Sequence, residues 1–396
     1  MKGLYVCGCL VGLATTAHGQ GQVTGKILDR QTHQPVPYAG VSVLGGRTGT
    51  TSNAEGEFVL TLSALPARLV VTQLSYRRDT VAVATAGALR PIELVPAPTT
   101  LPTVEMGSYT AELLRKAFRV LQHTNAAKHY GQAFYRQTTR LDATPTEVQE
   151  MVWDVRASSA GLEGTHLAQA RYAKRKDALL SYKDLSNLTK TFQLYLPTAA
   201  DTLQKGRVLS ADPATYYNLR LLGLTQNAGQ TLAEIEFVGK PAYNPAHVQG
   251  TIVIDTDTYQ VLRFRVGMDA ITHSNNPTFK FKNGRVNYDV AFRPQPAGTV
   301  LDYIKTTYTI TVGRMLKPDI QEEATGFTYF YGWQPTPASV AYAAPSAQVS
   351  DLAAIKQTTY DPAFWRDNPV VKRTPLEDEV IRSFEQQKAF GTLFDK

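Results

Sequence analysis

The chain has 396 residues, of which 43% are hydrophobic and 19% are charged. This composition excludes intrinsic disorder over the whole length, and the length predicts two or three packed units at about 100 to 200 residues per domain. The formal net charge of +7 is only a mild basic excess.

The N-terminus has the pattern of a secretory signal peptide. Lys2 is followed by an apolar run over 4–14 and by small residues at Ala17 and Gly19, which predicts cleavage after Gly19. A membrane-spanning helix needs about 20 apolar residues, and this run is roughly half as long. We therefore predict a signal peptide over 1–19 and an exported protein, either periplasmic or associated with the outer membrane.

Both cysteines, Cys7 and Cys9, lie inside the predicted signal peptide. Cleavage would leave no thiol for a disulfide, a nucleophile or a metal ligand. Lipidation of Cys9 stays open as a minor alternative, although lipoprotein signals have a longer apolar stretch before the cysteine. Because an exported chain rarely meets nucleic acid, we expect no nucleic-acid partner, and the basic excess favours an anionic envelope surface.

Short runs of alternating apolar residues occupy residues 22–95, separated by turn clusters such as Gly45-Gly46 and 53–56. Strands of this length and spacing predict a small β-sandwich. Three blocks, at 23–29, 35–43 and 50–58, resemble the carboxypeptidase-like regulatory domain. The resemblance implies a transthyretin-like sandwich, common at the N-termini of exported Bacteroidota proteins.

One position departs from that family. Ser75 stands before Tyr76 where the family has a glycine, which leaves the local turn geometry open. The family name suggests a zinc carboxypeptidase, but none of the seven histidines has the spacing that a zinc site needs. The resemblance therefore implies the accessory sandwich without its enzyme, and we expect no metal and no cofactor.

A Pro- and Thr-rich segment over 96–107 is predicted to be an extended linker. Beyond it, residues 108–396 are predicted to form an antiparallel β domain with flanking helices. The first helix is expected over 109–124, where apolar residues recur at helical spacing. Its apolar stripe must pack against a sheet.

Six alternating runs predict that sheet: 231–238, 248–255, 260–266, 279–282, 285–292 and 306–312. Asn283-Gly284 is the strongest hairpin signal between two of them, and residues 255–258 are a second turn. The meander resembles the curved half-barrel of periplasmic lipoprotein carriers such as the lipoprotein-localisation proteins. The predicted fold class is thus mainly β, with a sandwich followed by a larger antiparallel sheet.

The C-terminal region begins with an aromatic segment, 360–365, which we expect to dock on the sheet. Thr374, a proline and Glu377 then form a capping box that starts a helix. Leu376, Val380, Ile381 and Phe384 are its predicted apolar face, and Gly391 is placed to end it.

Candidate catalytic residues are few. Asp255 and Asp257 form a D-x-D pair, but the other oxygen ligands of a calcium loop are missing, and capping of a tight turn explains both. Glu55 and Glu57 flank a hairpin glycine and need no catalytic role. No nucleophile elbow, P-loop or dinucleotide fingerprint is present. We therefore predict no catalytic residues, while a pair of carboxylates that converges in space stays open.

The charge run 171–176 places four cations around Tyr172. It is interpreted either as a solvated strand edge or as a contact with the phosphates of an anionic membrane or polysaccharide. On the second interpretation, replacing Lys174, Arg175 and Lys176 with Gln would abolish salt-sensitive binding to anionic vesicles.

Three functions remain open. The first is a non-catalytic envelope protein in which the sandwich is an accessory module and the sheet binds a protein, glycan or lipid of the envelope. The second is a periplasmic lipid or lipoprotein carrier with an apolar groove in the sheet. The third is an envelope hydrolase.

Overall fold

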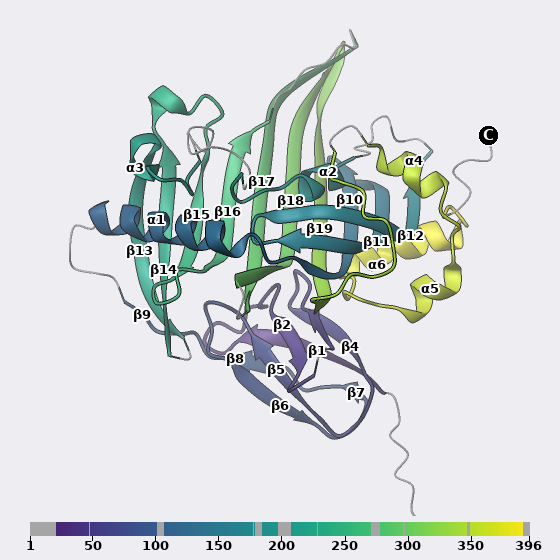
Figure 1. The fold of residues 1–396 in the computed structure, drawn as a ribbon. Helices are drawn as coiled ribbons and strands as arrows, with labels where there is room; N and C mark the ends of the chain where they lie inside the picture. The colour runs from purple at the N-terminus through teal and green to yellow at the C-terminus, as the bar shows by residue number, and fades with distance from the viewer. Residues whose placement is uncertain are drawn as a thin grey trace, which may run out of the picture.

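The structure is a computed structural model. It describes residues 21–46, 48–100, 107–176, 178, 184–196, 207–227, 229–270, 278–295, 298–346 and 349–390. The predicted signal peptide over 1–19 and Gly391 lie outside the described residues. Figure 1 shows the N-terminal sandwich, in purple, packed below a much larger sheet.

The sandwich has two four-stranded sheets. One has the order β4-β1-β7, with β8 also paired to β1, and the other has the order β3-β2-β5-β6. The strands are β1 (Gly21–Asp29), β2 (Gly40–Val43), β3 (Gly49–Thr51), β4 (Glu57–Leu62), β5 (Ala67–Thr72), β6 (Asp79–Val83), β7 (Gly87–Ala88) and β8 (Ile92–Leu94). Alternate apolar side chains such as Val23, Ile27 and Phe58 are fully buried between the sheets, which confirms the predicted sandwich.

The second part of the chain is built on an 11-stranded sheet in the order β12-β11-β10-β19-β18-β17-β16-β15-β14-β13-β9. Its strands are β9 (Thr99–Thr100), β10 (His129–Leu141), β11 (Thr144–Ser158), β12 (Gly161–Lys174), β13 (Tyr217–Asn227), β14 (Gln230–Gly239), β15 (Gln249–Asp255), β16 (Val261–Asp269), β17 (Phe279–Gln295), β18 (Gly298–Arg314) and β19 (Lys317–Gln334). All neighbouring pairs are antiparallel, as predicted.

The predicted hairpin at Asn283-Gly284 is wrong. Both residues lie inside the single strand β17, where the register with β18 shifts between Lys282 and Arg285. Asn283 has φ +56°, a conformation that Asn adopts more easily than most residues and that suits a bulge as well as a turn. The Asn-Gly pair therefore marks a register shift within one strand and not the hairpin turn that it predicts.

Strands β13 and β19 were not among the predicted runs. Strands β10, β11 and β12 were not predicted either. Their side chains are buried on both faces of the sheet, and the buried set includes Arg136, Gln137 and Glu150. A strand that buries polar residues on both sides has no apolar–polar alternation in its sequence.

One face of the sheet, called the inner face here, packs against α1 (Gly107–Thr124) and residues 184–196, which include α2 (Ser186–Lys190). The predicted helix over 109–124 is confirmed, and its buried Leu114 and Phe118 belong to the main core. Two further short elements, α3 (Pro213–Tyr216) and the 3-10 helix η2 (Pro241–Tyr243), flank β13 and β14.

The C-terminal segment passes around the edge strand β12. Ala343 forms a bridge with Thr165 of β12, which covers the free edge of that strand. The next helix, α4 (Asp351–Lys356), lies on the inner side, where Asp351 pairs with Lys190 at 2.5 Å. The two helices that follow, α5 (Pro362–Asp367) and α6 (Pro375–Gln386), lie on the opposite face, called the outer face here.

The predicted docking of residues 360–365 and the capping box are both confirmed. Trp365 of α5 is buried against Phe134 and Val152 on the outer face. The Thr374 hydroxyl accepts a hydrogen bond from the Glu377 backbone, and the Glu377 carboxylate accepts one from the Thr374 backbone.

The apolar face of α6 is narrower than predicted. Ile381 and Phe384 are buried, but Leu376 is exposed. It stands in the first turn of the helix, between the two residues of the capping box.

The described first part of the predicted linker, residues 96–100, makes contacts with both parts of the chain. Ala97 donates a backbone hydrogen bond to Ser75 of the sandwich, and β9 pairs with Leu224 and Thr225 of β13. Residues 97–100 are therefore held to the sandwich and to β13 through paired backbone groups.

Candidate functional site

The charge run 171–176 does not form one basic surface. Arg171 is buried on the outer face, whereas Tyr172 is buried on the inner face. Only Arg175 and Lys176 are exposed. Successive side chains of a strand point to opposite faces, so most of a run in sequence is separated in space.

Arg171 belongs to a cluster of buried charges on the outer face. Strand pairing places Glu150 of β11 directly between Arg136 of β10 and Arg171 of β12. The Nε atoms of both arginines donate to the Glu150 carboxylate at 2.6 Å. All three side chains are at least 95% buried.

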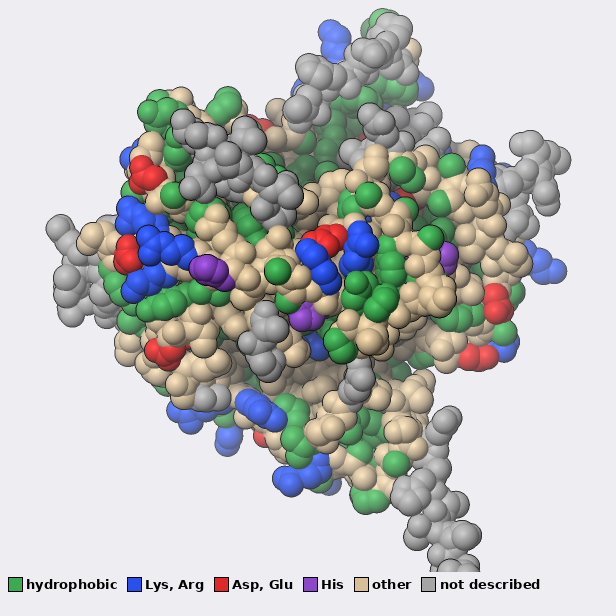
Figure 2. Space-filling model, viewed as in Figure 1, with side chains coloured by type: hydrophobic (Ala, Val, Ile, Leu, Met, Phe, Trp, Pro, Cys, Tyr) green, Lys and Arg blue, Asp and Glu red, His purple; other side chains and the backbone are tan. Residues whose placement is uncertain are grey.

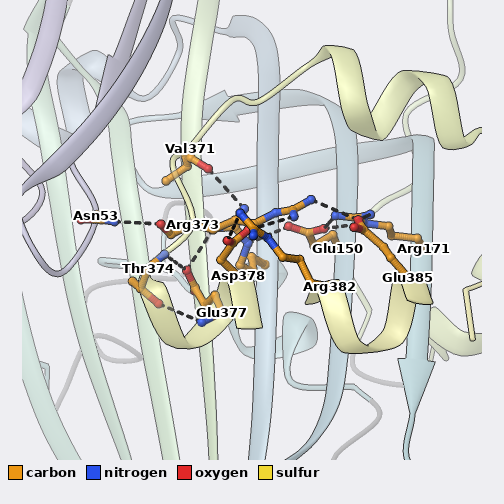
Figure 3. Close-up of polar contacts among 11 residues, drawn as sticks. Asn53, Glu150, Arg171, Val371, Arg373, Thr374, Glu377, Asp378, Arg382 and Glu385 are labelled. Carbon is orange, nitrogen blue, oxygen red and sulfur yellow. Dashed lines mark hydrogen bonds and ion pairs between the residues drawn. The ribbon is translucent and has the colours of Figure 1, made fainter. Parts of the chain in front are cut away.

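The C-terminal segment completes this cluster (Figure 3). Arg136 donates to Glu377 at 3.2 Å, and Arg171 donates to Glu385 at 3.0 Å. The Arg171 guanidinium also lies 4.7 Å from the ring centre of Trp365, as in a cation–π contact. These five charged residues, Arg136, Glu150, Arg171, Glu377 and Glu385, are called the outer ion cluster.

The pKa of Glu150 shows how strongly the arginines act. Burial by itself would raise this pKa, but the charges of Arg171 and Arg136 outweigh it and lower the pKa to about 2. Glu150 is therefore ionised at any physiological pH, which suits an ion pair within the sheet and does not suit a general acid.

A cleft of about 1060 Å³ opens beside the outer ion cluster, between the sandwich, the C-terminal segment and β10–β12. Two of its cations pair with acidic residues of the same chain: Lys372 with Glu57 at 2.9 Å, and Arg373 with Asp378 at 3.4 Å. The pair from Lys372 to Glu57 joins the C-terminal segment to the sandwich. We call this cleft the ionic cleft.

A second cleft of about 630 Å³ lies between the sandwich and the outer face at the lower ends of β17–β19. Its lining includes a group of aromatic side chains, namely Tyr38, Tyr76, Phe292, Tyr303, Tyr329, Tyr331 and Trp333. We call it the aromatic cleft. Both β2 and β5 of the sandwich and β16–β19 of the sheet contribute to it, so it exists only when the two parts are packed together.

Tyr38 connects the two sides of the aromatic cleft. Its ring stacks on Phe327 of β19 at a centroid distance of 5.0 Å and lies 5.3 Å from the ring of Tyr303. Lys305 lies 5.3 Å from the centre of the same ring. Tyr38 also has φ +56°, a backbone conformation that is uncommon for residues other than glycine.

Charged groups stand beside the rings. Arg263 makes a two-pronged ion pair with Asp289, at 2.8 and 2.6 Å, and Arg293 pairs with Asp302. Arg78 lines the cleft, is exposed, and has no ion pair among the described residues. The cleft therefore offers aromatic faces together with at least one guanidinium whose hydrogen-bonding capacity is open.

Of the carboxylates singled out in the sequence, Asp255 and Glu57 have structural roles. Asp255 accepts hydrogen bonds from the backbone of Asp257 and Thr258 at 2.9 and 3.0 Å, which confirms that it caps the turn. Asp257 is exposed beside it. Within the described ranges, no three His, Cys, Asp or Glu side chains gather as a metal site would require.

None of these clefts could be found from the sequence. Glu150, Arg136 and Tyr38 have no motif, and they come together through strand register or domain packing. Glu57 was recognised only as a hairpin residue, and nothing near it in the sequence points to Lys372. As for the membrane, no helix in the described part of the chain combines the length and apolarity needed to span a bilayer.

Comparison with known proteins supports the N-terminal assignment. Residues 23–103 match the CarboxypepD_reg-like domain family. The comparison with curated proteins gave no match.

Two solved structures show a distant likeness to this chain. One is a DUF1329 family protein from Desulfovibrio piger, with 9% identity and a TM-score of 0.26 over 64% of this chain and 98% of that one. The other is a LolA superfamily protein from Nitrosomonas europaea, with 13% identity and a TM-score of 0.22 over 59% of this chain and 95% of that one. Scores this low describe a distant likeness only.

Proposed function

We propose that this chain is a non-catalytic exported protein of the cell envelope that binds a glycan in the aromatic cleft. The observation that carries the proposal is the aromatic lining of a cleft that the sandwich and the sheet form together. In this arrangement the sandwich supplies one wall of the binding site as well as serving as an accessory module.

The chemistry of the cleft supports a polar ligand with apolar faces. Tyrosine and tryptophan rings provide flat apolar surface together with a polar edge. Sugars have the matching combination, since C–H groups cover the faces of the ring and hydroxyls surround it. Tyr331 is half-buried on the cleft wall, and the exposed Arg78 stands on the opposite wall as a hydrogen-bond donor.

The proposal includes the absence of catalysis. Carboxylates that line the two clefts are held in ion pairs, for example Asp302 with Arg293 and Glu57 with Lys372. A general acid needs a raised pKa near the working pH. The pKa of Glu150 instead lies far below its usual range because of the adjacent arginines.

The test is calorimetric titration of the purified protein with soluble peptidoglycan fragments and with oligosaccharides released from lipopolysaccharide. Tyr331→Ala and Arg78→Ala should each weaken binding about tenfold, as expected for the loss of one ring face or one charged hydrogen bond. Tyr243→Ala and Arg90→Ala are matched controls, because both residues are exposed and lie outside the residues that line the two clefts.

Equal losses in the cleft variants and the controls would show that the aromatic cleft is not the site. Turnover of the sugar, measured as new reducing ends, would overturn the non-catalytic assignment.

The carrier hypothesis stays a prediction with a different site. An acyl chain would have to lie on the inner face, where Leu114, Phe118 and Tyr195 already fill the space between α1 and the sheet. Organic extraction of the purified protein followed by mass spectrometry separates the two hypotheses, since a carrier would release lipid.

A further inference from the structure

The strands β17–β19 extend beyond the rest of the sheet at the end opposite to the sandwich (Figure 1). Arg314 of β18 pairs with Lys317 of β19, so Met315 and Leu316 form a two-residue turn at the tip. Met315 is 74% exposed and Leu316 is 100% exposed. The turn therefore presents two adjacent apolar side chains at the end of the longest strands.

Leu316 also has an uncommon backbone conformation. Its φ of +58° lies in the left-handed region, where glycine and asparagine are favoured and a branched side chain is disfavoured. Neither folding nor solubility accounts for leucine at this position, because a glycine or asparagine would serve both better. A position that has leucine where both the backbone conformation and the exposure to solvent favour other residues is a candidate for a functional role.

Cations surround the apolar turn. The flanking segments 278–285 and 313–319 contain five Lys or Arg residues, at positions 280, 282, 285, 314 and 317, and a single acidic residue, Asp319. Lys282 pairs with Asp319 at 2.8 Å. Lys280 and Lys317 are exposed, and neither has an ion pair within the described part of the chain. Figure 2 shows Lys and Arg side chains at this end of the molecule.

We propose that this turn, with its collar of cations, docks the protein on an anionic lipid bilayer. Apolar side chains at a protruding point can enter the boundary between head groups and acyl chains, about 5–10 Å deep, while the lysines remain among the lipid phosphates. A protein partner would instead need a broad complementary surface, of at least about 1000 Å² in total for a stable complex. A two-residue turn offers far less area than that.

The membrane contact uses Lys280 and Lys317 in place of the run 171–176, of which only Arg175 and Lys176 are exposed. The aromatic cleft lies at the opposite end of the same strands. Docking at the tip would therefore leave that cleft open to solvent. The two proposals rest on different residues, and either can fail without the other.

The test is sedimentation of the full chain with vesicles of phosphatidylglycerol and phosphatidylethanolamine at a ratio of 1:3. Binding is measured at low salt, where the Debye length is about 10 Å or more and charges on the protein and the lipid attract each other, and at high salt, where this attraction is screened. Lys280→Gln together with Lys317→Gln should weaken binding about 30-fold, at about fivefold for each cation near the surface. Arg30→Gln together with Arg90→Gln is the matched control, since it removes the same charge from exposed positions on the sandwich.

The apolar part is tested with Leu316→Asn, which keeps a residue suited to the left-handed turn. Binding should fall about tenfold, and most of this loss should persist at high salt because it comes from apolar contact. Leu44→Asn is the control, since Leu44 is an exposed leucine on the sandwich.

Three results would each overturn the proposal: no binding of the wild type to these vesicles, equal losses for the tip and sandwich charge variants, or unchanged binding of Leu316→Asn. A bilayer of phosphatidylcholine alone should bind weakly. Equal binding to it would show that the cations have no part in docking.

Discussion

The two faces of the large sheet each bury a glutamate, and the two glutamates have opposite surroundings. Glu150, on the outer face, is 1% exposed and lies between two arginines. Glu322, on the inner face, is 6% exposed, and its cross-strand neighbours are Leu141 and Ile310.

Their pKa values differ accordingly. Burial raises the pKa of Glu322 to about 6, with only a weak opposing effect from the charge of Lys174. The arginines beside Glu150 reverse the same effect of burial and bring its pKa to about 2. Both carboxyl groups are buried, yet the neutral form is stabilised on the inner face and the ionised form on the outer face. The presence or absence of neighbouring arginines determines which form is stabilised.

The largest expected effect is that of Glu150→Gln. The substitution leaves two buried guanidinium groups without their central carboxylate, and the free energy of unfolding should fall by about 3 kcal/mol at pH 7. Urea denaturation measures it. Glu385→Gln is the control, since its exposed carboxylate should contribute less than about 1 kcal/mol. A loss for Glu150→Gln no larger than that of the control would contradict the role of the ion cluster.

The same carboxylate predicts an acid transition. The pKa of Glu150 is lower in the folded state than the ordinary 4.5. The contribution of its ionised carboxylate to the free energy of unfolding is therefore complete above pH 4.5 and is lost as the pH falls toward 2. Stability measured between pH 5 and pH 2.5 should therefore decline less steeply for Glu150→Gln than for the wild type. Parallel curves would argue against the lowered pKa.

The inner face should respond in the opposite direction. The pKa of Glu322 is raised in the folded state, so the folded protein favours the protonated carboxyl. The resulting contribution to the free energy of unfolding is complete below pH 4.5 and is lost as the pH rises through 6. Glu322→Gln should stabilise the protein by about 2 kcal/mol at pH 8, and the gain should vanish at pH 4. Glu323→Gln is the control, because this next residue points to the other face.

A smaller effect is expected at the start of α6, which covers the outer ion cluster. Thr374→Ala removes the capping hydroxyl and should cost about 1 kcal/mol in thermal or urea denaturation. Ser350 precedes α4 but makes no capping hydrogen bond with its side chain, so Ser350→Ala should change stability little. Similar effects at the two positions would mean that the capping box does not stabilise this region.

The smallest effect is expected at the hairpin tip, and it has the opposite sign to the change in vesicle binding. Leu316→Asn should stabilise the fold by about 0.5 kcal/mol or slightly more, because asparagine tolerates the left-handed conformation better than leucine. Thermal denaturation measures it, with Leu44→Asn as the reference. A destabilised Leu316→Asn would show that leucine stabilises the turn, and the argument from unfavourable conformation would fail.

Local patterns predicted those parts of the fold that local chemistry controls. The capping box at Thr374 and the helix over 109–124 need only neighbouring residues, and both are present. Asn283-Gly284 was misinterpreted because the same backbone conformation serves a turn and a bulge. The actual hairpin at Met315-Leu316 has no turn signal, since its residues are unfavourable for the turn they form.

The candidate sites lay beyond such patterns. Glu150 meets Arg136 and Arg171 through the register of three strands, and Glu57 meets Lys372 through the packing of the C-terminal segment on the sandwich. Neither contact can be recognised from a local sequence pattern, because the partners are distant in the chain. Strands with buried polar residues on both faces also lack the alternation by which they could have been recognised.

The sequence by itself determined the N-terminal sandwich, the mainly β fold and the first and last long helices, because each follows from hydrophobic period, turn residues and caps within a few positions. Only the tertiary structure decided which charges are paired, which carboxylate is ionised and where the clefts lie. Those properties depend on side chains that are distant in the chain and on their removal from water, and both arise only when the sheet, the sandwich and the C-terminal helices pack together.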